Sequence, residues 1–281
     1  MPVMIMKKVL VLWLSLACLI CASLLPATAY AVNFAAGAKP EPGYQLKLYP
    51  FYYAADIRTN KDGNPAVTDL GLKKYGVSIG NFYQIGDLQL NAIIPVGKLE
   101  IGKQNSEDAG LGDIQLRAGW YLPVKWASIL PALMVKVPTG SFDKNNKANM
   151  GDGQTDLVAE IYFFKLLQPL SFDAVLKYAV RFRNPDSDVT PGNEFTAEGL
   201  ITCRLAERIR VGPAVNFLVG GNNKKAGKAL ADSGLMRLSA GGEIWYGRFD
   251  HVHISLAAYK DVLTRNINEG VTAMSRIVFD F

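Results

Sequence analysis

The chain has 281 residues, of which 49% are hydrophobic and 20% charged, and its formal net charge is +5. Acids and bases are interspersed, with no stripe of Lys and Arg interleaved with aromatics, so a nucleic-acid partner is not expected. The length suits either one β-barrel or two ordinary domains.

The first 31 residues are typical of an export signal. A lysine pair forms the positive n-region, residues 9–25 form an apolar core, and small residues follow in which the A-x-A cleavage pattern fits twice. Cleavage after Ala29 or after Ala31 satisfies this pattern. The second site is favoured because it leaves residues 32–43 as a polar, flexible periplasmic lead-in. A retained membrane anchor is the alternative, although no further apolar helix follows.

Beyond the signal, segment after segment alternates apolar and polar residues with period two, which predicts strands with two different faces. In residues 172–183 the even positions are all apolar, whereas Asp173, Lys177 and Arg181 occupy odd positions. Each segment has about ten residues, the length that a tilted strand needs to cross a bilayer. Strands are expected near residues 44–53, 72–82, 87–97, 112–122, 128–137, 155–164, 170–183, 194–205, 209–219, 234–246, 251–260 and 270–281.

The connections between these strands alternate in length with one phase along the chain. Long polar loops are expected at 56–70, 100–111, 139–154, 184–193, 220–233 and 263–269, and short links at 84–86, 123–127, 165–169, 206–208 and 247–250. Outer-membrane barrels have short periplasmic turns and longer extracellular loops. The sequence therefore predicts an all-β fold over residues 44–281: a transmembrane antiparallel up-and-down β-barrel of about 12 strands in the lipid bilayer of the cell outer membrane.

A soluble β-sandwich or lipocalin-like barrel in the periplasm is the alternative, because alternation alone allows it. Charged residues at mid-strand positions on most strands favour a polar lumen, where the selectivity of a barrel is set. Bases outnumber acids there, which favours acidic solutes, unless residues such as Lys177 or Arg181 pair with Glu160 or Glu198 and close the interior. The candidate lumen residues are Arg117, Lys136, Glu160, Lys177, Arg181, Glu198, Arg204, Arg237 and Glu243.

The chain ends in an amphipathic segment with Ile277, Phe279 and Phe281 on one face. This ending resembles the C-terminal assembly signal of bacterial outer-membrane proteins, a last strand that ends in Phe. Arg276 departs from that pattern, which often has glycine at this position. The resemblance implies the outer-membrane assembly machinery as a partner.

Three short motifs follow one another: G-L-G-D-I at 110–114, P-T-G-S-F at 138–142 and G-D-G-Q-T-D at 151–156. In that order and spacing they resemble the outer-membrane family named for the putative meta-pathway of phenol degradation, whose members are treated as transporters. The resemblance implies a barrel that takes up small hydrophobic or aromatic compounds. By themselves, the glycines allow tight turns at strand ends, and Asp113 and Asp156 are expected to face the lumen where strands begin.

No catalytic set can be placed on the sequence. His251 and His253 share one face of a strand without a visible third metal ligand, so a position at the periplasmic rim is expected. Residues 143–152 are rich in oxygen ligands but lack the one-three-five carboxylate spacing of a calcium loop. Cys203 falls on an apolar face, and the other two cysteines lie within the export signal, so no disulfide is expected.

The sequence thus predicts an outer-membrane channel or transporter for passive or facilitated uptake, with a small hydrophobic or aromatic solute as its partner. No enzymatic activity, cofactor or metal is expected. The alternative is a structural or interaction barrel with a closed lumen, and an outer-membrane enzyme such as a lipase or protease is a third.

Overall fold

The computed structural model describes residues 32–249 and 251–281. The export signal predicted over residues 1–31, with both candidate cleavage sites, lies outside the described residues. No helix in the described part of the chain is both long and apolar enough to cross a membrane.

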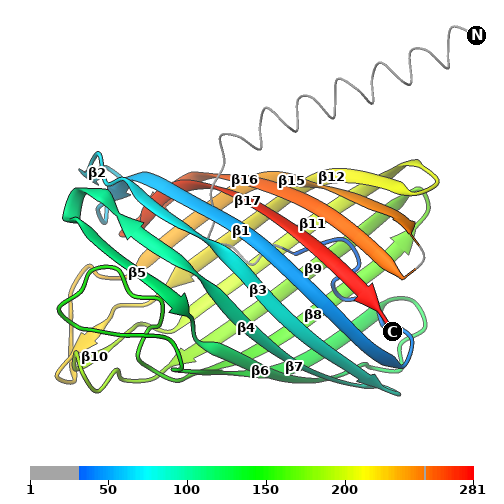
Figure 1. The fold of residues 1–281 in the computed structure, drawn as a ribbon, viewed down its shortest axis with the longest axis horizontal. Coiled ribbons are helices and arrows are strands. Elements are labelled where there is room, and N and C mark those ends of the chain that lie inside the picture. The colour runs from blue at the N-terminus through cyan, green and yellow to red at the C-terminus, as the bar shows by residue number, and fades with distance from the viewer. Residues whose placement is uncertain (1–31, 250) are drawn as a thin grey trace, which may run out of the picture.

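Twelve antiparallel strands close into one barrel, as predicted (Figure 1). Each strand pairs with the next barrel strand along the chain, and the last pairs back with the first, where Leu48 lies opposite Ile277. The barrel strands are β1 (Gly43–Thr59), β3 (Leu72–Ile85), β4 (Leu88–Ile101), β6 (Ile114–Trp120), β7 (Ser128–Val137), β8 (Asp156–Leu167), β9 (Leu170–Arg181), β11 (Glu194–Ala206), β12 (Ile209–Gly220), β15 (Leu235–Phe249), β16 (Val252–Arg265) and β17 (Asn268–Asp280).

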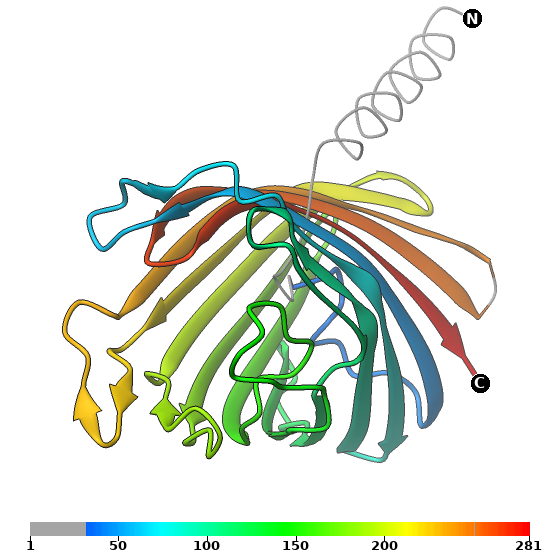
Figure 2. The ribbon, with the colours of Figure 1, turned by 60° about the vertical axis from the view of Figure 1, so that its left-hand side comes forward.

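The two ends of the barrel differ in the length of their connections. The long connections lie at one end, called here the loop end, which is at the left in Figure 1 and comes forward in Figure 2. The short turns and the C-terminus lie at the opposite end, called here the turn end. Small elements within the long connections are β2 (Pro65–Val67), η1 (Gly102–Gln104), β5 (Ser106–Leu111), β10 (Val189–Thr190), β13 (Lys224–Lys225) and β14 (Lys228–Ala229).

One predicted long loop, at 263–269, is wrong. Strand β16 continues to Arg265 and β17 begins at Asn268, so the connection is a tight turn in which Asn266 takes a left-handed φ of 54°. Inside the barrel, Thr264 Oγ1 lies 3.2 Å from Thr59 Oγ1 of β1. This buried polar contact is compatible with continued strand pairing, so the polar residues here mark a lumen face rather than a loop.

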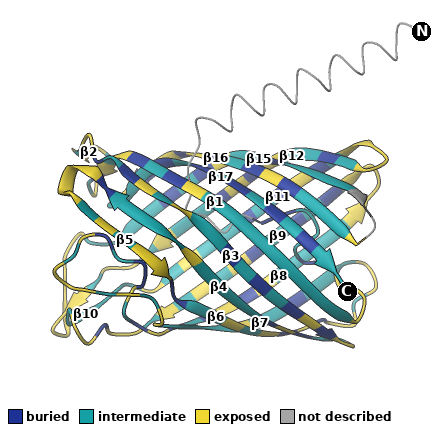
Figure 3. Cartoon of the chain, viewed as in Figure 1, coloured by how far each residue is buried: buried dark blue, intermediate teal, exposed yellow. Residues whose placement is uncertain are grey.

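The strands separate apolar from charged side chains, and the exposed surface is the apolar one. Leu133 and Leu256 on the outside are 51% and 57% exposed, whereas Glu160 and Glu243 on the inside are 4% and 2% exposed. Figure 3 shows the resulting alternation of burial along the strands. A soluble barrel would place its apolar residues inside, so the distribution contradicts the soluble alternative and fits a surface covered by hydrocarbon.

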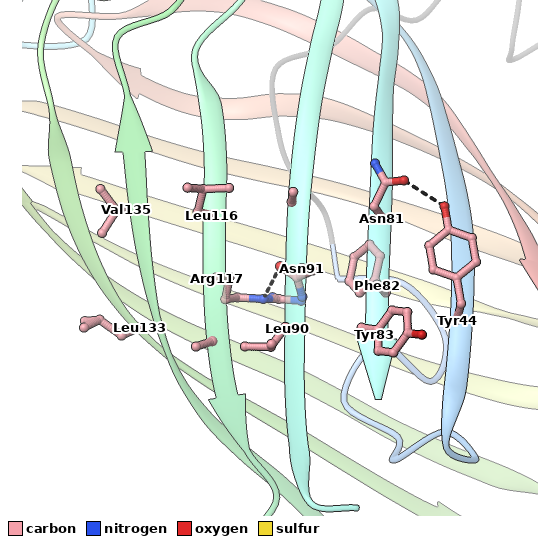
Figure 4. Close-up of a pocket in the computed structure, with 12 residues that line it drawn as sticks. Tyr44, Asn81, Phe82, Tyr83, Leu90, Asn91, Leu116, Arg117, Leu133 and Val135 are labelled. Atoms are coloured by element: carbon pink, nitrogen blue, oxygen red, sulfur yellow. Dashed lines mark hydrogen bonds between the residues drawn. The ribbon is translucent and has the colours of Figure 1, made fainter. Parts of the chain in front are cut away.

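Figure 4 shows part of this apolar outer surface over β3, β4, β6 and β7. A hollow of about 590 Å³ has Leu90, Leu116 and Leu133 among its lining, with the small Ala92 and Ala118 between them. These side chains belong to the outer face of the wall. The charged and polar groups that could bind a solute lie instead in the lumen.

The start of the described chain lies inside the barrel rather than outside it (Figures 1 and 2). Residues 32–38, called here the N-terminal segment, belong to the stretch expected as a flexible periplasmic lead-in. Val32 is only 3% exposed and packs in a buried cluster with Val175, Leu200 and Tyr259 of the barrel wall. The lead-in expectation is thus wrong for this segment, because apolar and polar groups of the lumen bind it.

Candidate functional site: the barrel lumen

Most of the predicted lumen residues do line the interior, and they are joined by ion pairs. At mid-barrel, Lys177 Nζ lies 2.7 Å from Glu198 Oε1, which is one of the expected cross-strand pairs. Arg117 Nη1 lies 3.3 Å from Glu160 Oε2 and also donates to the hydroxyl of Tyr162. On the opposite wall, Arg237 Nε lies 3.9 Å from Asp261 Oδ1. Much of the lumen charge is therefore internally compensated.

A second set of charges lies toward the loop end and is called here the mouth cluster: Lys136, Asp152, Asp156, Arg181 and Glu194. Lys136 contacts Asp156 and binds Asp152 at 2.5 Å. Arg181 binds Asp152 at 3.0 Å and Glu194 at 2.6 Å. Asp152 belongs to the connection between β7 and β8, so its ion pairs fasten this loop to Lys136 of β7 and Arg181 of β9.

The prediction for Arg204 is not supported, because its side chain is exposed at the turn end, beside the turn that contains Pro169. The buried arginine of this region is Arg210, which sequence reasoning missed. It donates from Nε to Thr202 Oγ1 at 2.9 Å and from Nη2 to the Pro169 carbonyl at 2.9 Å. Its guanidinium carbon also lies 4.9 Å from the centroid of the Phe34 ring. Arg210 therefore supports the N-terminal segment.

Charged side chains hold the backbone of the N-terminal segment. Glu243 Oε1 accepts a hydrogen bond from Phe34 N at 2.8 Å, and Asp173 Oδ1 accepts one from Ala36 N at 3.1 Å. Arg276 Nη2 donates to the Phe34 carbonyl at 2.7 Å. Hydrogen bonds to charged groups are among the stronger ones in proteins, each contributing roughly 1.5 to 3 kcal/mol. The segment is thus bound specifically.

Aromatic contacts complete the attachment. The Phe34 ring lies 4.9 Å from the Trp245 ring and 5.9 Å from the Phe164 ring, centroid to centroid. Tyr121 donates its hydroxyl to the Ala38 carbonyl at 2.8 Å. These contacts come from β8, β15 and the turn after β6, so the segment bridges the interior.

Two cavities in the lumen flank the N-terminal segment. The larger has a volume of about 640 Å³ and includes the mouth cluster in its lining. The other, of about 600 Å³, lies toward the turn end and is bordered by Trp245 and Phe281. Three residues line both cavities: Ala36 of the segment, Lys47 of β1 and Arg276 of β17. This place, called here the junction, lies between the two halves of the lumen.

The two histidines lie at the turn end, where the sequence placed them. His253 Nε2 is 3.2 Å from Asp280 Oδ2, and its ring stacks on Trp245 with a centroid distance of 5.7 Å. His251 borders the same cavity. Within the described residues, no group of three or more His, Cys, Asp or Glu side chains is arranged to hold a metal ion.

The three sequence motifs come together in one structural unit at the loop end, called here the Asp113 clasp. Asp113 Oδ1 accepts from Gly140 N at 3.0 Å, and Oδ2 accepts from Asp152 N at 2.8 Å. Thr139 Oγ1 accepts from Ile114 N at 2.9 Å. Asp113 was expected to face the lumen. It instead uses both carboxylate oxygens to fix the backbone of the β7–β8 loop.

The motif glycines allow this loop to approach itself closely. A Cβ atom on Gly140 would lie 2.7 Å from Gly151 Cα, and a Cβ on Gly151 would lie 2.8 Å from Asp113 Oδ1. Both separations are too short for side-chain atoms, so the two positions require glycine. The motifs therefore have a structural role in seating the loop that carries Asp152.

A closed antiparallel barrel with an apolar exterior, a charged interior and unequal ends is an outer-membrane β-barrel. The chain belongs to the family described as "Putative MetA-pathway of phenol degradation", whose sequence model matches residues 81–277.

Solved structures of the same architecture are similar to this chain over most of its length. The COG4313 outer membrane channel from Pseudomonas putida F1 aligns with a TM-score of 0.81 and 16% identity, covering 89% of this chain and all of the other. The NanC porin aligns with a TM-score of 0.52 and 9% identity, covering 84% and 99% of the two chains. A comparison with curated protein sequences finds no match.

Proposed function

We propose that this protein is an outer-membrane channel for the passive or facilitated uptake of small hydrophobic or aromatic compounds. The observation that carries the proposal is the pair of lumen cavities that meet at Ala36, Lys47 and Arg276. A short segment separates them, so its displacement would join the cavities into one path. Aromatic rings line both, with Phe82 on the loop-end side and Trp245 on the turn-end side. The loop end faces the cell exterior, as in other outer-membrane barrels.

The family description and the fold support this proposal. The family is described by a pathway of phenol degradation, and the solved structure with a TM-score of 0.81 is an outer membrane channel. The lumen bases would attract acidic solutes to the path, because side chains that line a pore set its selectivity. The bases proposed for this role are Arg117, Lys136, Lys177, Arg181 and Arg237, and Glu160 and Glu198 moderate their charge as the partners of Arg117 and Lys177.

A barrel with a permanently closed lumen is the second candidate, and the bound N-terminal segment favours it. Glu243, Asp173 and Arg276 hold this segment with hydrogen bonds of 2.7 to 3.1 Å. In that case the long loops would carry the function by binding a partner.

Conductance separates the two candidates. The mature protein and a variant that lacks residues 33–38 are reconstituted in planar bilayers, and uptake of a panel of aromatic compounds is measured against a deletion strain. A channel conducts in both forms, more strongly without the segment, and uptake is lost in the deletion strain. A wild-type protein that neither conducts nor supports uptake is a closed barrel. Turnover of an ester substrate would instead favour an enzyme.

We further infer that residues 1–31 are an export signal that is removed, and that Ile277, Phe279 and Phe281 are recognised by the outer-membrane assembly machinery. The alternation of β17 supports the second inference, since Arg276 and Val278 line the lumen, whereas Ile277 and Phe279 alternate with them on the other face of the strand. N-terminal sequencing of the protein isolated from outer membranes tests the first inference.

A further inference from the structure

The junction between the two lumen cavities carries two cations on adjacent strands. Lys47 of β1 and Arg276 of β17 both line the cavity toward the loop end and the cavity toward the turn end. The small Ala36 of the N-terminal segment is the third residue that lines both cavities. A solute that moves from one cavity to the other therefore passes these two side chains.

Lys47 differs from Arg117, Lys177 and Arg237 in lacking an acidic partner. Among the described residues, no carboxylate lies within 4.0 Å of Lys47 Nζ, whereas Arg117 and Lys177 are each paired with a glutamate. Arg276 is also without a carboxylate at that distance in the described chain, but it donates to the Phe34 carbonyl. Charged groups in protein interiors are normally paired. A lone ammonium beside a cavity is thus suited to bind an anion that passes through.

An aromatic ring lies beside this ammonium group. Lys47 Nζ is 4.0 Å from the centroid of the Phe82 ring, and the guanidinium carbon of Arg117 is 5.6 Å from the same centroid. In the β1–β3 register, Gly80 lies opposite Lys47. A Cβ at Gly80 would lie 2.6 Å from Phe82 Cε2 and 3.2 Å from Tyr49 Cε2. Because Gly80 has no side chain, the rings of Phe82 and Tyr49 have room beside the Lys47 ammonium group.

We propose that Lys47 and the Phe82 ring form a binding subsite for small aromatic carboxylates at the junction. The solute carboxylate binds Lys47 Nζ, and its ring packs against Phe82. Arg276 adds positive charge on the neighbouring strand while it holds the N-terminal segment. This inference rests on the proposed channel function and gives it a substrate class, namely aromatic acids rather than neutral aromatic compounds.

The test compares a charged and an uncharged aromatic solute of similar size in liposomes. Flux of benzoate and of benzyl alcohol is measured for the wild-type protein, Lys47→Gln, Lys47→Arg and the matched control Lys144→Gln, which removes the same charge from an exposed loop. Lys47→Gln should lower benzoate flux about tenfold, the effect of one lost charge-assisted contact, and leave benzyl alcohol flux nearly unchanged. Lys47→Arg should retain most benzoate flux, and Lys144→Gln should behave as the wild type.

A second measurement needs no variant. Benzoate added to the wild-type protein in a planar bilayer should reduce the chloride current, and benzyl alcohol at the same concentration should not. Equal loss of both fluxes in Lys47→Gln, or unchanged benzoate flux, overturns the subsite while leaving the channel intact. The proposed function fails, and the subsite with it, if the wild-type protein conducts no ions and passes neither solute.

Discussion

Arg276 on the last strand donates a hydrogen bond to the carbonyl oxygen of Phe34 at the start of the described chain, at 2.7 Å. The contact joins residues 242 positions apart. It belongs to a set in which lumen charges bind backbone groups of the N-terminal segment, with Glu243 and Asp173 as acceptors. The combined strength of these hydrogen bonds determines how often the N-terminal segment leaves its binding site in the lumen.

Replacing Phe34 by Ala should increase channel opening. The variant loses the ring contacts with Trp245 and Phe164, at a cost below the roughly 3 to 5 kcal/mol of a fully buried Phe. The open fraction in single-channel recordings checks this expectation, with Phe182→Ala as the control because Phe182 is exposed. An open fraction equal to the wild type would show that the segment does not limit conduction.

A lysine should be tolerated in the lumen and not on the adjacent lipid-facing position. Leu133 faces outward, and Met134 lines the cavity toward the loop end. Leu133→Lys should cost about 2 to 4 kcal/mol if it lies near the bilayer midplane, whereas Met134→Lys enters a hydrated space. Resistance to unheated sodium dodecyl sulfate measures the difference. Equal resistance of the two variants would contradict the assignment of the two faces.

Asp113→Asn should release the β7–β8 loop. An amide can present only one acceptor oxygen, so one of the two backbone donors, Gly140 N or Asp152 N, loses its partner. Hydrogen exchange of residues 138–155 should become faster. The control is Asp143→Asn in the same loop, whose carboxylate accepts from Asn145 N. Similar exchange in both variants would remove the special role of Asp113.

The same loop should loosen in acid. Burial opposes ionisation of Asp152, but Lys136 and Arg181 outweigh this effect and lower the pKa of its carboxyl. A lowered pKa in the folded state means that the stabilisation is present above the ordinary pKa of Asp, about 3.9, and is lost as the pH falls through the lower folded value. Protease cleavage of the loop should therefore rise below about pH 4.

The variant Asp152→Asn provides the control for this pH dependence. The loop of this variant should be cleaved readily both above and below about pH 4, because position 152 then has no carboxylate to protonate. If the acid-induced rise were identical in this variant, another group would be responsible.

Phe281→Asp should reduce the amount of assembled barrel in the outer membrane. Phe281 is 75% exposed, and its ring lies 5.7 Å from that of Tyr44, so its loss removes little packing from the folded barrel. The expected defect is in recognition by the assembly machinery. Quantitative blotting of outer-membrane fractions, with Phe182→Asp for comparison, measures it. Normal levels of Phe281→Asp would exclude the C-terminal residue from recognition.

Period two was sufficient to predict the barrel strands because each strand has one face toward hydrocarbon and one toward the lumen. In residues 172–183, Asp173, Lys177 and Arg181 face inward and Leu176 faces outward. The same pattern carries no information on depth. Arg204 lies on the predicted polar face of β11, but it is exposed because it is close to the turn end. Arg210 of the next strand is buried.

The N-terminal segment could not be predicted, for a physical reason. Its hydrogen bonds to Glu243, Asp173 and Arg276 use backbone groups, which every residue carries, so the segment itself has no distinctive pattern. The Asp113 clasp is an intermediate case. Its motifs were visible in the sequence, but the contact between Gly140 and Gly151 depends on a loop conformation that spacing does not determine.

The position of the N-terminal segment has a consequence for the order of assembly. The groups that bind it belong to β9, β15 and β17, and they surround one interior only after β17 has paired with β1. A strand that pairs one residue out of register turns its lumen side chains toward lipid, which would remove Asp173 or Glu243 from the docking site. The N-terminal segment therefore has its full set of hydrogen-bond partners only in a barrel that is closed and correctly paired.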